Sequence, residues 1–272
     1  MTSFWRRYKP FLVAGIQELI TYRVNFFLYR AGDVLGAFVA FYLWRAVFDA
    51  SHQSLIKGFS LSDMTLYIIM SFVTGLLTKS DSSFMIGEEV KDGLIIMRLL
   101  RPVHFATSFL FMELGFRLMV FLSVGLPFLL LLFGMRLAAG VPVWQVTGSL
   151  LAFLMSLLLA FLINFYFNIC FGFSAFIFKN LWGSNLLKNS LVAFMSGSLI
   201  PLAFFPKLIA DLLHLLPFSS LVYTPVMIVI GKYSIAQICQ ALALQAFWIL
   251  VMVLASQLIW KKVQSHLTIQ GG

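Results

Sequence analysis

Six polar side chains interrupt the long apolar segments of this chain, and they fall into three pairs at helical spacing: Arg30 and Asp33, Glu113 and Arg117, and Asn164 and Asn168. Residues three or four apart are neighbours on a helix surface, so each charged pair could neutralise itself within one helix. A charge at the centre of a membrane helix costs about 2.5–3.5 kcal/mol on insertion scales, and such residues usually face protein or a cavity. We expect either structural pairs that fix helix packing or, around Glu113, a path for cationic or polar cargo.

Motifs for catalysis or for nucleotide binding are missing from the sequence. A Walker A loop needs Gly-x-x-x-x-Gly-Lys-Ser/Thr to hold phosphates, and Gly231-Lys232-Tyr233 lacks both the first glycine and the Ser or Thr after the lysine. Neither the Gly-x-Ser-x-Gly elbow nor the His-Glu-x-x-His helix occurs. The four histidines are too dispersed for a metal site. We therefore expect no enzyme, no bound cofactor and no metal.

The composition is that of a membrane protein. Hydrophobic residues make up 61% of the 272 residues and charged residues 11%, against roughly 45–50% and about 25% in soluble domains. The apolar runs are long and uniform, which predicts spanning helices and not a β-barrel. The net charge is +9, but no soluble basic domain is present to bind nucleic acid, and cytoplasmic Lys and Arg explain the charge. The predicted fold is one all-α integral membrane domain over residues 1–272.

An amphipathic helix in the membrane interface is predicted over residues 4–21, where apolar residues recur at helical spacing among charged ones. The first span contains Gly32 and Gly36, a small-xxx-small spacing that permits close packing of another helix. The second span could continue as a helix toward Glu89, and the fourth toward Phe178. Six spans are predicted, at about Val24–Phe48, Met64–Thr78, Thr107–Phe133, Val146–Phe173, Ser190–Phe205 and Ile235–Trp260.

The apolar region 190–230 is too long for one span, since about 20 residues cross a bilayer. It is broken by four prolines, Pro201, Pro206, Pro217 and Pro225. We expect one span followed by one or two short helices at 206–231 that re-enter the outer leaflet, where protein covers the broken backbone. The alternative is two complete spans, Leu191–Ile209 and Leu212–Ile230.

The distribution of Lys and Arg orients the predicted spans. With both termini in the cytoplasm, the outer segments hold only Lys57, Arg136, Lys207 and Lys232. The inner segments hold twelve basic residues: Arg6, Arg7, Lys9, Arg23, Lys79, Lys91, Arg98, Arg101, Lys179, Lys188, Lys261 and Lys262. Because such a bias is typical of cytoplasmic loops, we expect a multi-pass protein of the plasma (inner) membrane with both ends inside.

A polar segment from Lys79 to Pro102 separates the second and third predicted spans. It holds eight of the chain's 19 basic and 10 acidic residues, together with an apolar run from Leu94 to Leu100 that only Arg98 interrupts. Charges at this density are excluded from hydrocarbon. A short helix that is charged on one side and apolar on the other is typical of the membrane surface or of a partner's groove.

Two further stretches of sequence stand out, one after span two and one before span six. After span two the chain reads Asp92-Gly93-Leu94-Ile95-Ile96-Met97-Arg98-Leu99-Leu100-Arg101-Pro102, and before span six a Pro-broken segment runs from Phe204 to Gly231. With the interfacial helix and six spans, this order resembles the permease subunit of an ATP-binding-cassette (ABC) exporter of the type-two group, in the branch with paired permeases and a separate ATPase. The resemblance covers the whole chain, but its short motifs do not indicate the cargo.

In that family, a glycine followed by an apolar run ending in proline forms a coupling helix that sits in a cleft of the ATPase. The resemblance implies that the ATPase-docking residues here are Glu88, Glu89, Asp92, Gly93, Leu94, Ile95, Arg98, Arg101 and Pro102. It also implies two ATPase copies carrying ATP and Mg, and a second permease, identical or paralogous. Export of a drug, peptide, lipid or glycan-type substrate by alternating access would follow.

Two other classes of function stay open from the sequence. A channel or lipid scramblase would need no ATPase and would move its cargo without ATP. An intramembrane enzyme would lose turnover on substitution of a single nucleophile.

Overall fold

The computed structural model describes residues 2–178 and 180–270, with side chains over 4–178 and 180–264. In these residues the chain is helical and forms no strand; a single β-bridge pairs Ile56 with Phe59. The elements are α1 (Thr2–Thr21), α2 (Arg23–Ser51), α3 (Leu61–Thr78), α4 (Ser82–Lys91), α5 (Ile95–Leu99), α6 (Phe105–Val120), the π-helical turn η1 (Phe121–Gly125), α7 (Leu126–Ala138), α8 (Val143–Gly172), α9 (Ala175–Phe178), α10 (Trp182–Met195), the 3₁₀ turn η2 (Leu202–Phe204), α11 (Lys207–Leu215), α12 (Tyr223–Val229) and α13 (Ile235–Gln270).

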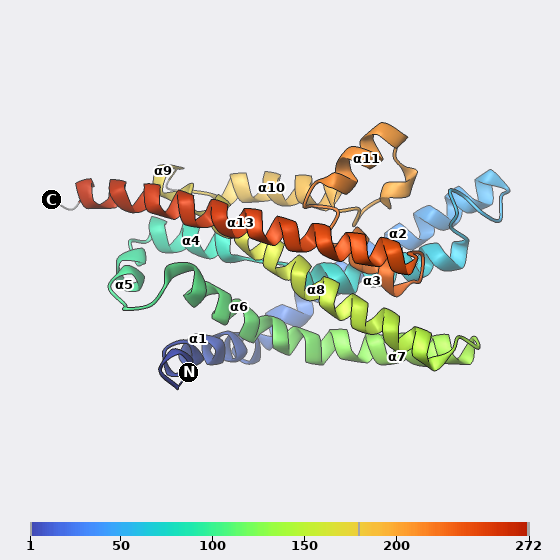
Figure 1. The fold of residues 1–272 in the computed structure, drawn as a ribbon, viewed down its shortest axis with the longest axis horizontal. Helices are drawn as coiled ribbons and strands as arrows, with labels where there is room; N and C mark the ends of the chain where they lie inside the picture. The colour runs from blue at the N-terminus through green and yellow to red at the C-terminus, as the bar shows by residue number, and fades with distance from the viewer. Residues whose placement is uncertain (1, 179, 271–272) are drawn as a thin grey trace.

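Five rods among the described residues are long and apolar enough to cross a membrane. They run along the long axis of the molecule (Figure 1) and correspond to predicted spans one to four and six: Arg23–Ser51, Leu61–Lys91, Phe105–Ala138, Val143–Phe178 and Ile235–Gln264. The expected extensions past the second and fourth spans are present as α4 and α9. The protein is therefore an all-α integral membrane protein.

The predicted fifth span, Ser190–Phe205, is not one helix. α10 begins eight residues earlier, at Trp182, and ends at Met195; the chain then turns at Gly197, whose φ is +79°. A positive φ does not occur in a right-handed helix, so α10 cannot continue through this residue. Glycine adopts the conformation readily, whereas residues with side chains rarely do. The boundary was misjudged because Lys188 was assigned to a polar loop, whereas it is buried inside α10. Lys179, counted with the inner basic residues, lies outside the described residues.

The Pro-broken region contains short helices, as predicted. α11 projects from the bundle (Figure 1), whereas every residue of α12 is buried. The alternative of two complete spans, Leu191–Ile209 and Leu212–Ile230, does not form, because the chain is non-helical at 196–201 and 216–222. Tyr67 on α3 secures the first of these breaks by donating a hydrogen bond to the Gly197 carbonyl at 2.7 Å.

α1 packs along α6 by direct backbone contact. A Cβ added to Gly15 would lie 1.9 Å from the Met112 carbonyl oxygen, and one added to Gly115 would lie 2.0 Å from that of Leu12. Both positions therefore require glycine. The predicted amphipathic helix over 4–21 exists as α1, but its inner face meets protein through a glycine pair that the sequence analysis did not single out.

Two buried clusters hold the rods together. The larger one includes residues of α3, α8 and α12. The smaller one joins α4, α5, α6 and α8 and packs against α13, where Trp260 stacks on Phe105 with ring centroids 4.4 Å apart. This second cluster lies beneath the Lys79–Pro102 segment and supports it.

Candidate coupling segment and intramembrane polar network

The Lys79–Pro102 segment folds as α4, a tight turn and α5. Gly93 has φ +72°, which only glycine adopts without strain, and the turn reverses the chain between the two helices. Figure 1 shows α5 at the end of the molecule to which the C-terminal end of α13 also points. The short helix expected between Asp92 and Pro102 is therefore present, at the tip of a spanning rod.

Arg98 fastens α5 to the bundle. Its Nε donates to Glu89 Oε2 at 2.8 Å, a second contact joins Nη2 to Glu89 Oε1, and Nη1 donates to Ser108 Oγ at 2.9 Å. The guanidinium carbon lies 3.8 Å from the centroid of the Phe109 ring. Ile95 is buried in the cluster below. Three residues predicted to contact an ATPase, Glu89, Ile95 and Arg98, thus face inward and position the segment.

The other predicted docking residues are exposed. Glu88, Asp92, Gly93, Leu94, Arg101 and Pro102 all lie on the surface of the segment. Four large apolar side chains form an exposed strip that we call the α5 ridge, with exposed fractions of 58% for Leu94, 59% for Ile96, 63% for Met97 and 76% for Leu100. Of these four residues only Leu94 is among the docking residues predicted from the sequence, because sequence alone does not show the backbone path that separates them from Ile95.

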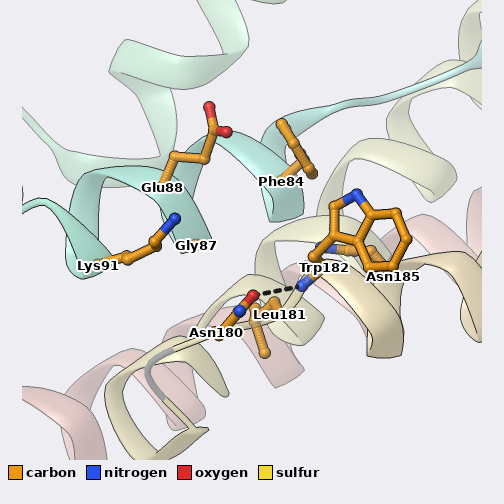
Figure 2. Close-up of a pocket in the computed structure, with 8 residues that line it drawn as sticks. All are labelled: Phe84, Gly87, Glu88, Lys91, Asn180, Leu181, Trp182 and Asn185. Carbon is orange, nitrogen blue, oxygen red and sulfur yellow. Dashed lines mark hydrogen bonds between the residues drawn. The ribbon is translucent and has the colours of Figure 1, made fainter.

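A small cavity of about 200 Å³ opens beside α4. Figure 2 shows Glu88 and Lys91 of α4 on one side and Asn180 and Trp182 on the other, with Trp182 N donating to Asn180 Oδ1 at 3.0 Å. The Trp182 side chain is exposed. The cavity therefore has polar groups on two sides and lies beside the helix that precedes α5.

The spacing-based pairing of Glu113 with Arg117 is wrong: among the described residues no ion pair joins them. Arg117 binds Asp81 instead, with Nη2 2.9 Å from Oδ2. Glu113 accepts hydrogen bonds at Oε1 from Ser80 Oγ at 2.9 Å and from the Asp81 amide at 3.0 Å. Helical spacing showed which side chains share a face, but it could not show that the break between α3 and α4 brings other partners.

That break explains most of the intramembrane polar residues. α3 ends at Thr78 and α4 begins at Ser82, so the last carbonyls of α3 and the first amides of α4 lack helical partners. The Thr78 carbonyl accepts from Asn164 Nδ2 at 2.8 Å, and the Leu76 carbonyl accepts from Arg117 Nη1 at 3.3 Å. An unsatisfied backbone group is costly where water is excluded. These side chains therefore replace the missing helical hydrogen bonds.

Asn168 belongs to a second polar cluster, around a buried lysine. Lys188 is 8% exposed, and its ammonium donates to Ser83 Oγ at 2.7 Å, to Asn185 Oδ1 at 2.9 Å and to Asn168 Oδ1. All three donors of the ammonium are thus used. Of this cluster, only Asn168 was predicted from the sequence as an intramembrane polar residue. The spacing of Asn185 and Lys188, three residues apart, could have indicated that they share a helix face.

Arg30 and Asp33 form the ion pair predicted from their spacing, with Nη1 2.6 Å from Oδ2. Gly32 and Gly36 were predicted to permit close packing of another helix. In the structure both are exposed, and a Cβ on either would meet nothing within 4 Å. Among the described residues Gly32 and Gly36 pack against no helix, and Gly15 and Gly115 provide the close contact between helices.

The chain as described holds no obvious metal centre, since no group of three or more His, Cys, Asp or Glu side chains is arranged to hold an ion in the described residues. Near the interface, partial burial raises the pKa of Glu18, with Asp81 adding to the effect and Arg117 opposing it.

Comparison with known proteins assigns the family. The chain matches the model for the ABC-2 family transporter protein over residues 34–271, which includes α5 and all but the first part of the first span. No curated protein matches the sequence. The match covers most of the chain, and the five spanning rods agree with it. The chain therefore belongs to the ABC-2 transporter family and is a membrane-spanning permease component of an ABC transporter system, and membership of this family implies an ATPase partner.

Proposed function

We propose that this permease forms the transmembrane path of an ATP-driven exporter in which two copies of a separate ATPase dock on the α5 ridge. A second permease, identical or paralogous, completes the path in the plasma membrane, and both termini lie in the cytoplasm. ATP and Mg bind the ATPase copies, whose closure moves α5 and re-gates the path. The observation that carries this proposal is the exposed ridge at the tip of a spanning rod.

The ridge is suited to a protein groove. Burying a large aliphatic side chain contributes about 1.5–3 kcal/mol, and Leu94, Met97 and Leu100 are all more than half exposed. Asp92 and Arg101 flank the ridge and are exposed as well. An apolar centre with a polar rim is the usual make-up of a protein interface.

The attachment of the ridge is suited to carrying force. A segment that receives motion must be stiff where it joins the bundle, because a loose joint would absorb the displacement. Arg98 contacts Glu89 of α4 and Ser108 of α6, so a movement of α5 is passed to two helices at once. The inward residues therefore hold α5 against the bundle, and the exposed residues of the α5 ridge bind the ATPase.

A charge placed on the ridge tests the docking. We expect Leu100→Asp to lower capture of the ATPase by the purified permease at least tenfold and to abolish stimulation of ATP hydrolysis. Leu55→Asp is the matched control, because Leu55 is also an exposed leucine, 60% exposed, in the loop between α2 and α3. Equal effects of the two variants would overturn the proposal. Cargo movement by the permease alone, without ATP, would favour the channel or scramblase.

Orientation is tested by labelling. In a chain whose two free cysteines, Cys170 and Cys239, are replaced by serine, Met97→Cys should react with a membrane-impermeant maleimide only in inside-out vesicles, and Leu55→Cys only in intact cells. The opposite pattern would place α5 outside and exclude docking to a cytoplasmic ATPase.

A further inference from the structure

Two cavities lie beside α2 and α3; α1 and α6 also line the first, and α7 also lines the second. The first is about 460 Å³ and is lined by charged residues, and the second is about 410 Å³ and is lined almost entirely by apolar ones. Asp33 lines the first, and its neighbour Val34 lines the second. Both volumes are in the range of ligand sites. Together they form one amphipathic cleft.

The polar cavity carries charges of both signs. Arg30 pairs with Asp33 at 2.6 Å, while Asp81 receives both Arg117 at 2.9 Å and Lys79 at 3.1 Å. The remaining acid on the wall, Glu18, balances the third cation. The buried Nε atoms of Arg30 and Arg117 have no hydrogen-bond partner in the described chain. The cavity thus offers three cations and three carboxylates.

Charge balance selects the headgroup that fits. A headgroup with a single charge would be attracted by half of the wall and repelled by the other half, and like charges 4 Å apart repel by about 4 kcal/mol at an effective dielectric of 20. A headgroup with a phosphate and an ammonium can place each beside the opposite sign. The cavity is therefore complementary to a zwitterion.

The apolar cavity has the shape and surface for an acyl chain. Phe38 and Phe41 of α2 face Ile68 and Phe72 of α3, with Phe128 of α7 also on the wall. From Asp33 to Phe41 the helix rises about 12 Å at 1.5 Å per residue. One leaflet of hydrocarbon is about 15 Å deep, half of the 30 Å core. A lipid with its headgroup beside Arg30 would therefore place its chain along this wall.

We propose that the α2–α3 cleft binds one phospholipid with a zwitterionic headgroup, held at Arg30 and Asp33 and extended along Phe38 and Phe72. The lipid comes from the leaflet on the side of α1. It covers the inner end of α2, which otherwise has few buried residues. This inference does not depend on the export function, because binding is measured without an ATPase.

Native mass spectrometry of the delipidated full-length permease tests the site. The protein is titrated with phosphatidylethanolamine and, separately, with phosphatidylglycerol of the same acyl chains. We expect the first phosphatidylethanolamine to bind at least tenfold more tightly than phosphatidylglycerol. Arg30→Gln removes a cation beside the phosphate and should weaken binding of phosphatidylethanolamine at least tenfold. Ala37→Trp should fill the apolar wall and weaken that binding to a similar degree.

Each variant has a control on the same helix. Arg45→Gln removes an exposed arginine paired only loosely with Asp49, at 3.9 Å, and Val39→Trp adds bulk at a 67% exposed position outside the cleft. Both should bind phosphatidylethanolamine as the unmodified chain does. Equal affinity for the two lipids, tighter binding of phosphatidylglycerol, or equal losses in variants and controls would overturn the proposal. The proposal would also be overturned if Ala37→Trp abolished the dimer peak in the mass spectrum without changing lipid binding, since a second copy of the chain would then cover the cleft.

Discussion

Removing Glu89 should release α5 from the bundle while the rest of the permease stays folded. Arg98 would keep only Ser108 and the face of Phe109 as partners. Its side chain is 11% exposed and that of Glu89 is 21% exposed, so the pair is largely shielded from water. Breaking a pair of this kind leaves a cation without its counterion in a position of low exposure.

The magnitude follows from the two contacts that are lost. Hydrogen bonds to charged groups contribute about 1.5–3 kcal/mol each, whereas fully exposed pairs contribute less than about 1 kcal/mol. Allowing for the remaining exposure, we expect local opening of residues 93–101 to become easier by about 2–3 kcal/mol. Since 1.4 kcal/mol is a factor of ten, opening should rise about 30- to 150-fold.

Hydrogen exchange of the isolated permease in detergent measures this opening, because amide exchange reports local unfolding. Glu89→Ala should speed exchange at 93–101 and leave α8 and α13 protected. Glu88→Ala is the control: Glu88 is the exposed neighbour on the same helix, and no ion pair to it occurs in the described part of the chain. If the two variants exchange within a factor of two of each other, Arg98 does not fasten α5 as we argue.

Three further variants test the packing and the polar network. Gly115→Ala should lower stability by about 1–3 kcal/mol because α1 and α6 must move apart, whereas Gly134→Ala, which meets nothing within 4 Å, should leave the melting temperature unchanged or raise it. Asn164→Ala should cost about 1–3 kcal/mol by leaving the Thr78 carbonyl unpaired, and Asn189→Ala, at an exposed position, should cost much less in the same thermal unfolding assay. Glu113→Gln keeps an oxygen for Ser80 and the Asp81 amide, so the complex should assemble; if Glu113 also attracts cargo, transport should fall, and equal loss of transport and assembly would exclude that role.

The spanning rods could be predicted because their signal is the hydrophobicity of a long run. Val24–Phe48 and Ile235–Trp260 fall inside α2 and α13, and the short helix at 92–102 is present as α5. The error at Ser190–Phe205 has a specific cause. Lys188 was interpreted as a residue of a solvent-exposed loop, but its ammonium donates hydrogen bonds to Ser83, Asn168 and Asn185. The sequence alone does not show that oxygen atoms from three helices meet at this position.

The same limitation affected the candidate site. The pairing of Arg30 with Asp33 was predictable because both partners lie in one helix. The partner of Arg117 was not, because Asp81 is 36 residues away and reaches it only through the break after α3. Gly15 and Gly115 were not predicted as packing residues because neither has a second small residue four positions away in its own helix. Each helix instead contributes one glycine to the contact.

The break between α3 and α4 connects the polar network with the coupling segment. α4 is the continuation of a spanning rod, yet three non-helical residues separate it from α3. Glu113 of α6 binds the Asp81 amide in this break, and Asn164 of α8 binds the carbonyl of Thr78 at the end of α3. α5 is fastened to α4 and to α6 through Arg98. A push on the ridge therefore reaches α4 and α6 together, and Glu113 and Arg117 of α6 hold the joint at which α4 could turn relative to α3. Polar residues in a span are costly, and here they are placed where a rigid rod is divided into two parts, which is the arrangement that the proposed coupling through the α5 ridge requires.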